Sequence, residues 1–321
     1  MIRFSVALTL AAMTISAPAQ AQTFPTQPVK LIVTFAPGGT TDVLARAVAQ
    51  KMSENLKESV IVENRAGAAG NLGMGVLGRA APDGHTIGIG TLSTLAISPA
   101  ASKTVPYNAR KDFAPVAMMT EVPVILAIPA EFPANNLAEF IDYAKKNPAK
   151  VNFSSNGAGS STHMAGELLK RKFGFEMAHV PQGGDAPILN SLMGGHVQLG
   201  IIAAPPAVEF AKAGKIKVLA IISAKRNAAL PDVPTLGELG APEVVGSTWF
   251  GFMVPAGTPK DVVALLNREL NRAMDAPDTK KIFTTGGLDP IQMSVEQYAA
   301  FVASEQDRWA GIVQTLGVTQ D

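Results

Sequence analysis

The sequence has 321 residues, in which 27 lysines and arginines nearly balance 26 aspartates and glutamates, and it contains no cysteine. A near-neutral chain offers no electrostatic surface for nucleic acid or for an anionic membrane, so neither partner is expected. The absence of cysteine excludes disulfides and thiolate metal sites. The length predicts about two domains, which are large enough to be stable without such cross-links.

The first 21 residues have the pattern of a cleaved export signal. Arg3 is their only charge, residues 4–13 are apolar, and Ala19-Gln20-Ala21 matches the small-x-small site of signal peptidase. The apolar stretch is shorter than the ~20 residues that a membrane-spanning helix needs. The sequence therefore predicts a signal peptide at residues 1–21, export to the periplasm, and a mature chain that starts near Gln22.

Beyond the signal, short apolar strands alternate with Gly-rich turns and amphipathic helices. In chain order, the expected elements are a strand at 29–35, a helix beginning near Val43, a strand at 60–62, a helix over 71–80, strands at 86–90, 113–119 and 122–128, a helix over 137–146, a strand at 151–154, a helix over 162–173, a strand at 177–180, a helix over 185–193, a strand at 197–202, a helix over 208–213, strands at 218–222 and 249–254, and helices over 260–274, 279–284 and 295–316. Strands that alternate with helices favour a parallel, doubly wound α/β sheet.

The strongest local feature is the loop of residues 35–42, where a strand ends and a helix begins. Helix N-termini leave backbone amides unpaired and carry a partial positive charge, so they bind anions without a basic side chain. Gly38 and Gly39 let the backbone approach a ligand, and Thr40 and Thr41 add hydroxyl donors. A capped helix after a tight turn explains the same residues equally well.

The same arrangement recurs in the second half of the chain. Ser160, Ser161 and Thr162 stand where a helix should start, after a Gly/Ser loop, and residues 182–185 form a third such loop. Loops of this kind on two lobes could grip an acid between them. This doubling favours an anion site over the simple capping interpretation.

Other chemistries find little support. Gly157-Ala158-Gly159 lacks the third glycine of a dinucleotide fingerprint, and no glycine loop precedes the Lys-Ser/Thr pair of a phosphate-binding loop. The four histidines have no metal-like spacing. A hydrolase or isomerase that uses Ser160 or Ser161 with His163 stays an alternative, although serines at helix starts are far more often caps. Neither a catalytic residue, nor a metal, nor a cofactor is expected.

The ordered motifs resemble those of the solute receptors of tripartite tricarboxylate transporters, the TctC-like or Bug proteins. The matching segments are residues 35–42, Val62-Glu63-Asn64-Arg65 with Gly67, Pro82-Asp83-Gly84, Tyr107, Lys111-Asp112-Phe113, Pro115-Val116, Ser155-Asn156-Gly157, His163, Val180-Pro181, Gly183, residues 230–235, Trp249-Phe250-Gly251 and residues 255–259. Together they cover essentially the whole mature chain.

The resemblance implies a periplasmic-binding-protein fold (type II-like), in which two α/β lobes with mostly parallel sheets close over a carboxylate. With the pattern of extended stretches, it predicts a first lobe of residues 22–120 plus 250–321 and a second lobe of residues 121–249. It also implies these ligand-binding residues: Phe35, Gly38, Gly39, Thr40, Ser93, Ser155, Ser160, Ser161, Thr162, Gln182, Gly184 and Ala203.

Two departures from the family bear on the solute. Gln182 stands where many relatives have Tyr, and the strand ending at Ile202 runs into Ala203-Ala204, where relatives often place Asp. The missing carboxylate argues against a solute with an amino group and leaves a di- or tricarboxylate or an aromatic acid. The expected partners are the large and small integral membrane subunits of the transporter. A monomer is expected, and presentation of the solute to a sensor kinase stays open as an alternative.

Overall fold

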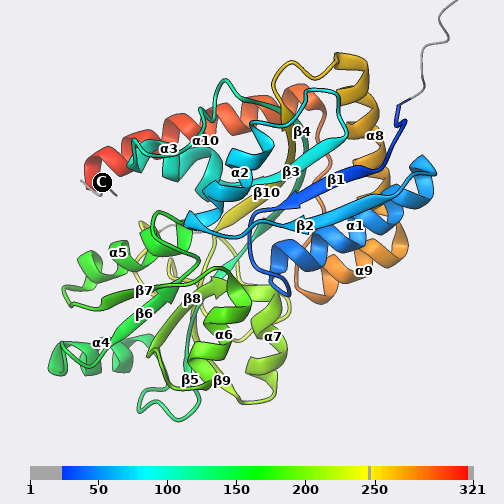
Figure 1. Cartoon of the computed structure of the whole chain (residues 1–321). Helices are drawn as coiled ribbons and strands as arrows, with labels where there is room; N and C mark the ends of the chain where they lie inside the picture. Colours follow the sequence, from blue (N-terminus) through cyan, green and yellow to red (C-terminus); the bar gives the residue numbers. More distant parts are fainter. Residues whose placement is uncertain (1–23, 245–246, 317–321) are drawn as a thin grey trace, which may run out of the picture.

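The computed structural model describes residues 24–244 and 247–316, which form two α/β lobes packed side by side (Figure 1). The expected signal peptide lies outside these residues. Within them, no helix has both the length and the hydropathy to cross a membrane. Each lobe is built on its own five-stranded sheet, with helices on both faces.

The first lobe combines the N-terminal part of the chain with its C-terminal part. Its elements are β1 (Val29–Val33), α1 (Thr40–Leu56), β2 (Val60–Asn64), η1 (Ala68–Gly70), α2 (Asn71–Leu77), β3 (Thr86–Thr91), η2 (Ser93–Ile97), α3 (Ser98–Ala101), β4 (Phe113–Val122), β10 (Thr248–Pro255), α8 (Lys260–Asp275), α9 (Pro277–Thr285) and α10 (Val295–Leu316). The strand order is β2-β1-β3-β10-β4. β1 runs parallel to β2 and β3, whereas β10 is antiparallel to both β3 and β4.

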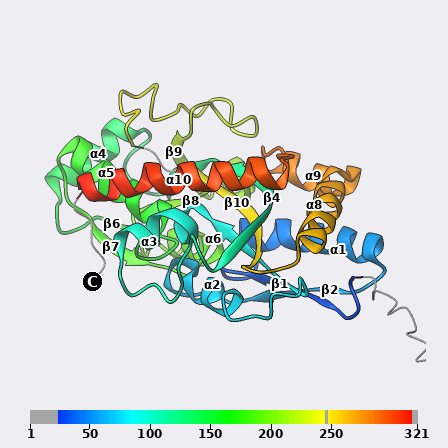
Figure 2. The ribbon, with the colours of Figure 1, turned by 90° about the horizontal axis from the view of Figure 1, so that it is seen from above.

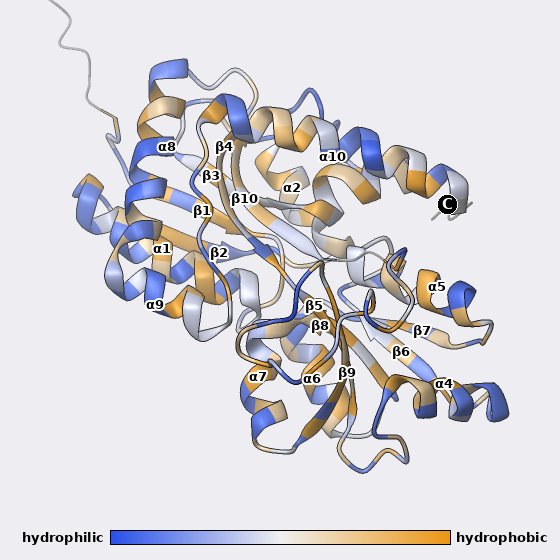
Figure 3. Cartoon of the chain, turned by 180° about the vertical axis from the view of Figure 1, so that it is seen from behind, coloured by the Kyte–Doolittle hydropathy of each residue, from blue (hydrophilic) through white to orange (hydrophobic). Residues whose placement is uncertain are grey.

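The helices of the first lobe divide between the two faces of its sheet. On one face, α1, α8 and α9 bury apolar residues such as Leu44, Leu266 and Phe283 against the strands. On the other face, α2, η2 and α10 bury Leu77 and Trp309. In Figure 2, the long helix α10 crosses this second face, where it packs against β4, η2 and α3. The inner strands β3 and β10 are buried along nearly their whole length because helices cover both faces, as expected for a doubly wound sheet. In Figure 3, polar and apolar stretches alternate along helices such as α10.

The second lobe is formed by one continuous segment. Its elements are β5 (Val124–Pro129), α4 (Leu137–Lys146), β6 (Asn152–Ser155), α5 (Ser161–Phe173), β7 (Ala178–Pro181), α6 (Asp185–Met193), β8 (Leu199–Ala203), α7 (Ala204–Lys212) and β9 (Ile216–Ile222). The strand order is β7-β6-β8-β5-β9, with β5 antiparallel to both of its neighbours. The helices α4 and α5 cover one face, and α6 and α7 cover the other.

The strands β4 and β10 lie side by side where the chain passes between the lobes. β4 ends at Val122 in the first sheet and β5 begins at Val124 in the second, so Pro123 alone connects them. The return strand, β10, pairs with β4 from Thr248 onward. The lobe limits expected from the sequence, 120/121 and 249/250, therefore fall within β4 and β10, close to these crossings.

The clearest differences from the sequence-based prediction concern three helical segments. η2 and α3, residues 93–101, were not predicted, because all five residues of η2 are buried and lack the polar face that makes a helix recognisable, and α3 is only four residues long. α7 begins at Ala204, four residues earlier than expected, and includes Pro205 and Pro206 in its first turn. Proline is well suited to that turn, since the amide it lacks would have no partner there.

Candidate ligand-binding cleft

A small cavity lies between the lobes, where the ends of β1, β3 and β8 meet the first turns of α1, α5 and α6. Its volume is about 20 Å³, so the two walls nearly touch. Its lining residues are Phe35, Gly39, Thr40, Thr41, Thr91, Ser93, Val124, Asn156, Ser161, Thr162, Asp185, Ala203, Thr248 and Phe250. None of these lining residues is a lysine, an arginine or a histidine.

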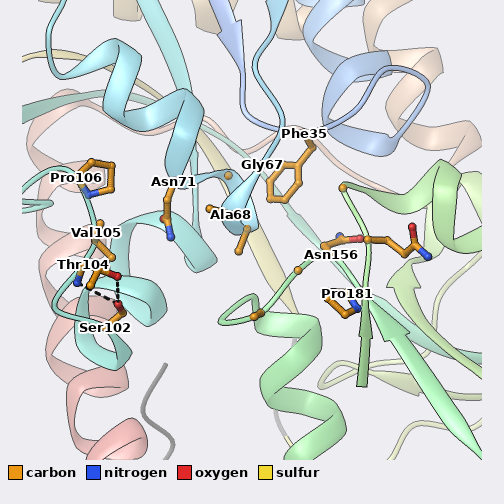
Figure 4. A pocket seen from close by; sticks show the side chains of 16 residues that line it. Phe35, Gly67, Ala68, Asn71, Ser102, Thr104, Val105, Pro106, Asn156 and Pro181 are labelled. Atoms are coloured by element: carbon orange, nitrogen blue, oxygen red, sulfur yellow. Dashed lines mark hydrogen bonds between the residues drawn. The ribbon is translucent and has the colours of Figure 1, made fainter. Parts of the chain in front are cut away.

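A larger cavity of about 480 Å³ adjoins it and shares Phe35 and Asn156 with it. Figure 4 shows its two walls, with Asn71 and Ala68 on the side of the first lobe and Asn156 and Pro181 on the side of the second. A solute whose polar end lies in the small cavity could therefore place its remaining atoms in the larger cavity.

The N-terminus of α1 is occupied by carboxylates of the protein itself. The amide of Gly38 donates to Asp42 Oδ2 at 2.9 Å, and Arg46 forms an ion pair with the same side chain at 2.9 Å. Burial opposes ionisation of Asp42, but hydrogen bonds from Arg46 and from Gly38 outweigh it and hold the pKa of Asp42 below its ordinary value. The amide of Gly38 is thus used within the first lobe and does not point to a solute.

A second carboxylate reaches the same helix end from the opposite lobe. Asp185 Oδ2 accepts hydrogen bonds from the Thr40 amide at 3.3 Å and from the Thr40 hydroxyl at 2.8 Å. Asp185 Oδ1 accepts from Asn156 Nδ2 at 3.0 Å and from the Ala203 amide at 3.3 Å. Asp185 is only 5% exposed. It therefore connects both lobes at the centre of the cleft.

The N-terminus of α5 is arranged differently. Ser160 caps the helix by accepting from the amide of His163, so its hydroxyl is a structural cap. The amide of Ser161 donates across the cleft to Ser93 Oγ at 3.0 Å. The hydroxyl of Thr162 accepts from the amide of Asn156 at 2.9 Å and fixes the preceding loop.

Backbone contacts also hold the lobes together. The amide of Ala36 donates to the carbonyl of Gly183 at 3.0 Å. Gly157 has a φ of +112°, and a Cβ there would lie 3.0 Å from the backbone nitrogen of Ala69 in the other lobe. Only glycine allows this approach, because it tolerates the positive φ and has no side chain. The structure is therefore the closed arrangement of the two lobes.

The structure gathers most, but not all, of the residues expected from the sequence. Those that line the small cavity are Phe35, Gly39, Thr40, Ser93, Ser161, Thr162 and Ala203. Gln182 lines the adjoining cavity. Four others line neither and hold the loops in shape: Gly38, Ser155, Ser160 and Gly184.

Two residues at the centre of the cleft were not predicted from the sequence. Asp185 closes the third glycine loop and begins the helix after it, but neither Asp185 nor Asn156 was among the expected ligand-binding residues. The position of Asp185 directly after Gly183-Gly184 was the available signal. Of the two aromatic residues near the second crossing, Phe250 lines the cavity, while Trp249 packs against α10 and donates to Glu305 at 3.1 Å.

The histidines do not form the pair required by the hydrolase alternative. His163 Nδ1 accepts from the amide of Gly159 at 3.1 Å, and the hydroxyl of Ser160 bonds to the backbone of His163 and not to its ring. The rings of His163 and His179 stack with centroids 4.1 Å apart. Burial and the nearby charge of Lys170 lower the pKa of His163 to about 4. Burial and His163 lower the pKa of His179 to about 4 as well.

A different serine, Ser155, lies 2.7 Å from His179 Nε2. Its hydroxyl also donates to the carbonyl of Gly157 at 3.2 Å, and the residue is fully buried. A nucleophile must reach its substrate, so this pair serves to fix the loop between β6 and α5.

Two lobes joined by paired crossings, with a polar cleft between facing helix N-termini, define a periplasmic-binding-protein fold. The family model of the tripartite tricarboxylate transporter family receptor matches residues 44–318. The chain belongs to this family. It is 36% identical over 304 residues to the protein BugT of Bordetella pertussis, an alignment that covers 94% of this chain and 93% of BugT.

Solved structures agree with this assignment. MatC from Rhodopseudomonas palustris with bound malate has a TM-score of 0.86 and 35% identity, over 90% of this chain and 100% of MatC. An R. palustris protein with adipate has a TM-score of 0.87 and 33% identity, over 92% of this chain and 99% of the other. The periplasmic binding protein BugD gives a TM-score of 0.88 at 32% identity, over 92% of this chain and 99% of BugD.

Proposed function

We propose that this protein captures a small organic carboxylate in the periplasm and delivers it to the large and small membrane subunits of a tripartite tricarboxylate-type transporter. Family membership supports the transport role, and two structurally similar proteins hold malate and adipate. The export signal expected at residues 1–21 is consistent with a periplasmic location.

The observation that carries the proposal is the pair of helix N-termini that face each other across the small cavity. In the described chain, no group accepts from the amides of Thr41 and Thr162, which lie in the first turns of α1 and α5. Both residues line the cavity, as does Ser161 with its hydroxyl. These donors from two lobes can hold one carboxylate without a cationic side chain, because helix N-termini favour negative charge.

Binding without catalysis is the proposed activity. The cleft has backbone amides and hydroxyls that can hold an anion, and the serine and histidine side chains nearby are engaged in capping and loop hydrogen bonds. A receptor for transport needs a cleft that opens and closes, and the crossing at Pro123, a single residue between β4 and β5, suits such a motion. We therefore expect no turnover of any bound carboxylate.

A thermal-shift screen tests the proposal directly. The purified mature protein is heated with malate, adipate, citrate or benzoate, and with the uncharged diamide of malic acid as a matched control. A solute at a hundredfold its dissociation constant should stabilise the protein by about 2.7 kcal/mol. If no carboxylate raises the melting temperature, or if the diamide raises it equally, the proposed carboxylate site is wrong.

A further inference from the structure

The cleft of the proposed receptor contains a carboxylate of its own. Asp185 is 5% exposed and lines the small cavity, where each of its oxygens already accepts two hydrogen bonds. All four donors are neutral: the amide and hydroxyl of Thr40, the amide of Ala203 and the side-chain amide of Asn156. These bonds satisfy the hydrogen-bonding capacity of both carboxylate oxygens but do not neutralise the negative charge.

Asp185 occupies the donors that a carboxylate of a solute would use in the first lobe. Thr40 was expected to bind the solute, yet both its amide and its hydroxyl donate to Asp185 Oδ2. Among the described residues, the donors that remain for a solute are the unpaired backbone amides of Thr41 and Thr162. They suffice for one carboxylate.

Ala203 does not leave the cleft without an acid, so it does not exclude a solute with an amino group. Ala203 stands where relatives often have Asp, and the sequence alone therefore suggested a cleft without an acid at this point. The structure places the carboxylate of Asp185 against the amide of Ala203, 3.3 Å away. Asp185, at the start of α6, therefore supplies an acidic group at the end of β8.

The charge of Asp185 opposes any carboxylate in the cleft; the unpaired amides of Thr41 and Thr162 offset this for one carboxylate, but no lining residue of the small cavity is a cation that would offset it for a second. At an effective dielectric constant of about 20, two unit negative charges about 5 Å apart weaken binding by more than roughly a hundredfold. A dicarboxylate would have to keep its second charge far from Asp185. A hydroxyl or an ammonium group would meet no such repulsion.

Asn156 provides an acceptor for a donor of this kind. Its Nδ2 donates to Asp185 Oδ1 at 3.0 Å, which fixes the orientation of the side-chain amide, since the flipped amide would place its oxygen against the carboxylate. Its Oδ1 is then buried without a hydrogen-bond partner among the described residues. Asn156 lines both cavities. Buried acceptors are rarely left unpaired, so a donor from the solute is expected there.

We infer that Asp185 determines solute specificity: the cleft takes a small monocarboxylate that carries a hydrogen-bond donor, a hydroxyl or an ammonium group, in preference to a dicarboxylate. The inference rests on the proposed function and narrows it. The carboxylate of the solute lies between the first turns of α1 and α5, and its donor group faces Asn156 and the charge of Asp185.

Two matched series of acids test this inference by isothermal titration calorimetry. One series is succinate, 3-hydroxypropanoate and 3-aminopropanoate, and the other is adipate, 5-hydroxypentanoate and 5-aminopentanoate. The hydroxy or amino acid of a series should bind at least tenfold more tightly than its dicarboxylate. Tighter binding of the amino acid than of the hydroxy acid would show that Asp185 acts as a counter-ion. Equal binding of the amino acid and the hydroxy acid would show that Asp185 and Asn156 accept any hydrogen-bond donor.

The variants Asp185→Ala and Asp185→Asn should then bind the dicarboxylate at least tenfold more tightly than the unaltered protein does. Asp185→Asn keeps the shape of the side chain and serves if Asp185→Ala does not fold. Asp142→Ala removes an exposed acid from α4 of the same lobe and should leave all affinities unchanged. The inference is wrong if the unaltered protein prefers the dicarboxylate, or if neither Asp185 variant alters the ratio. If all six acids fail to bind while malate, citrate or benzoate stabilises the protein, the inference fails and the proposed function stands; if none of these carboxylates binds, both fail.

Discussion

Ser93 in the first lobe accepts a hydrogen bond of 3.0 Å from the backbone amide of Ser161 in the second. Ser161 begins α5, and an amide in that turn has no partner within its own helix. Ser93 begins the buried helical segment η2, so its position is fixed by the core of the first lobe. The bond exists only while the lobes are closed, and it therefore favours the closed arrangement.

Replacing Ser93 by alanine should weaken solute binding without changing the fold. A neutral hydrogen bond contributes about 0.5–1.5 kcal/mol, so the affinity should fall roughly two- to tenfold. Isothermal titration calorimetry measures this change. Ser304→Ala is the matched control, because its hydroxyl bonds only within the exposed turn of α10. An affinity of Ser93→Ala equal to that of the control would mean that the bond does not contribute to closure.

Gly39 should tolerate a methyl group but not a branched side chain. Its φ is −80°, and an added Cβ would lie 3.7 Å from Asp185 Oδ2, an ordinary contact. Gly39→Ala should therefore bind the solute with nearly normal affinity. The two further methyl groups of Gly39→Val should push α6 away and weaken binding by at least a hundredfold. The circular dichroism of both variants should match the unaltered protein, since Gly39 faces the cleft, and normal affinity of Gly39→Val would remove this loop from the site.

Stability should fall as the pH is lowered from 6.5 toward 4. His163 and His179 have pKa values of about 4 in the folded protein, chiefly because of burial, against an ordinary value near 6.5. The unfolded chain thus takes up protons in this window and the folded protein does not. Each histidine lowers the free energy of unfolding by at most about 1.4 kcal/mol per pH unit, and by less at the half-buried His179, where solvent screens the charge.

Urea unfolding at pH 7.5, 5.5 and 4.5 measures this dependence. The variant His163→Gln should show a shallower loss of stability with falling pH, because one of the two buried imidazoles is gone. A free energy of unfolding that does not change between pH 7.5 and 4.5 would contradict the burial of both rings.

The order of most elements could be predicted from the sequence because most strands and helices carry their own hydrophobic pattern. The helices α4, α6 and α10 begin and end at the predicted residues, since each has a polar face or clear turn residues at its ends. η2 was inaccessible, because all five of its residues are buried and no periodicity distinguishes it from a loop.

Only part of the hydrogen bonding in the cleft could be predicted from the sequence. The turn residues around Thr40 and Ser161 predicted two helix N-termini near a ligand, and both line the small cavity. The partner of Thr40 could not be predicted, because Asp185 stands in the other lobe and meets Thr40 only through the closure of the two sheets. Local patterns identify donors, but they do not tell which acceptor of the protein itself will use them.

Gly251 should be the glycine of the first sheet that least tolerates alanine. It lies in β10, and an added Cβ would overlap the hydroxyl and ring of the fully buried Tyr298 and lie 3.0 Å from the carbonyl of Ala117. Overpacking of this kind costs about 1–3 kcal/mol, which a urea titration resolves. Gly311→Ala in α10 is the matched control, because no atom lies within 4 Å of the new methyl group, and alanine in a helix should stabilise the protein by up to about 1 kcal/mol. Equal stability of the two variants would mean that α10 does not pack on β10 as closely as the structure shows. The packing that fixes Phe250, which precedes Gly251 and lines the cleft, would then be absent.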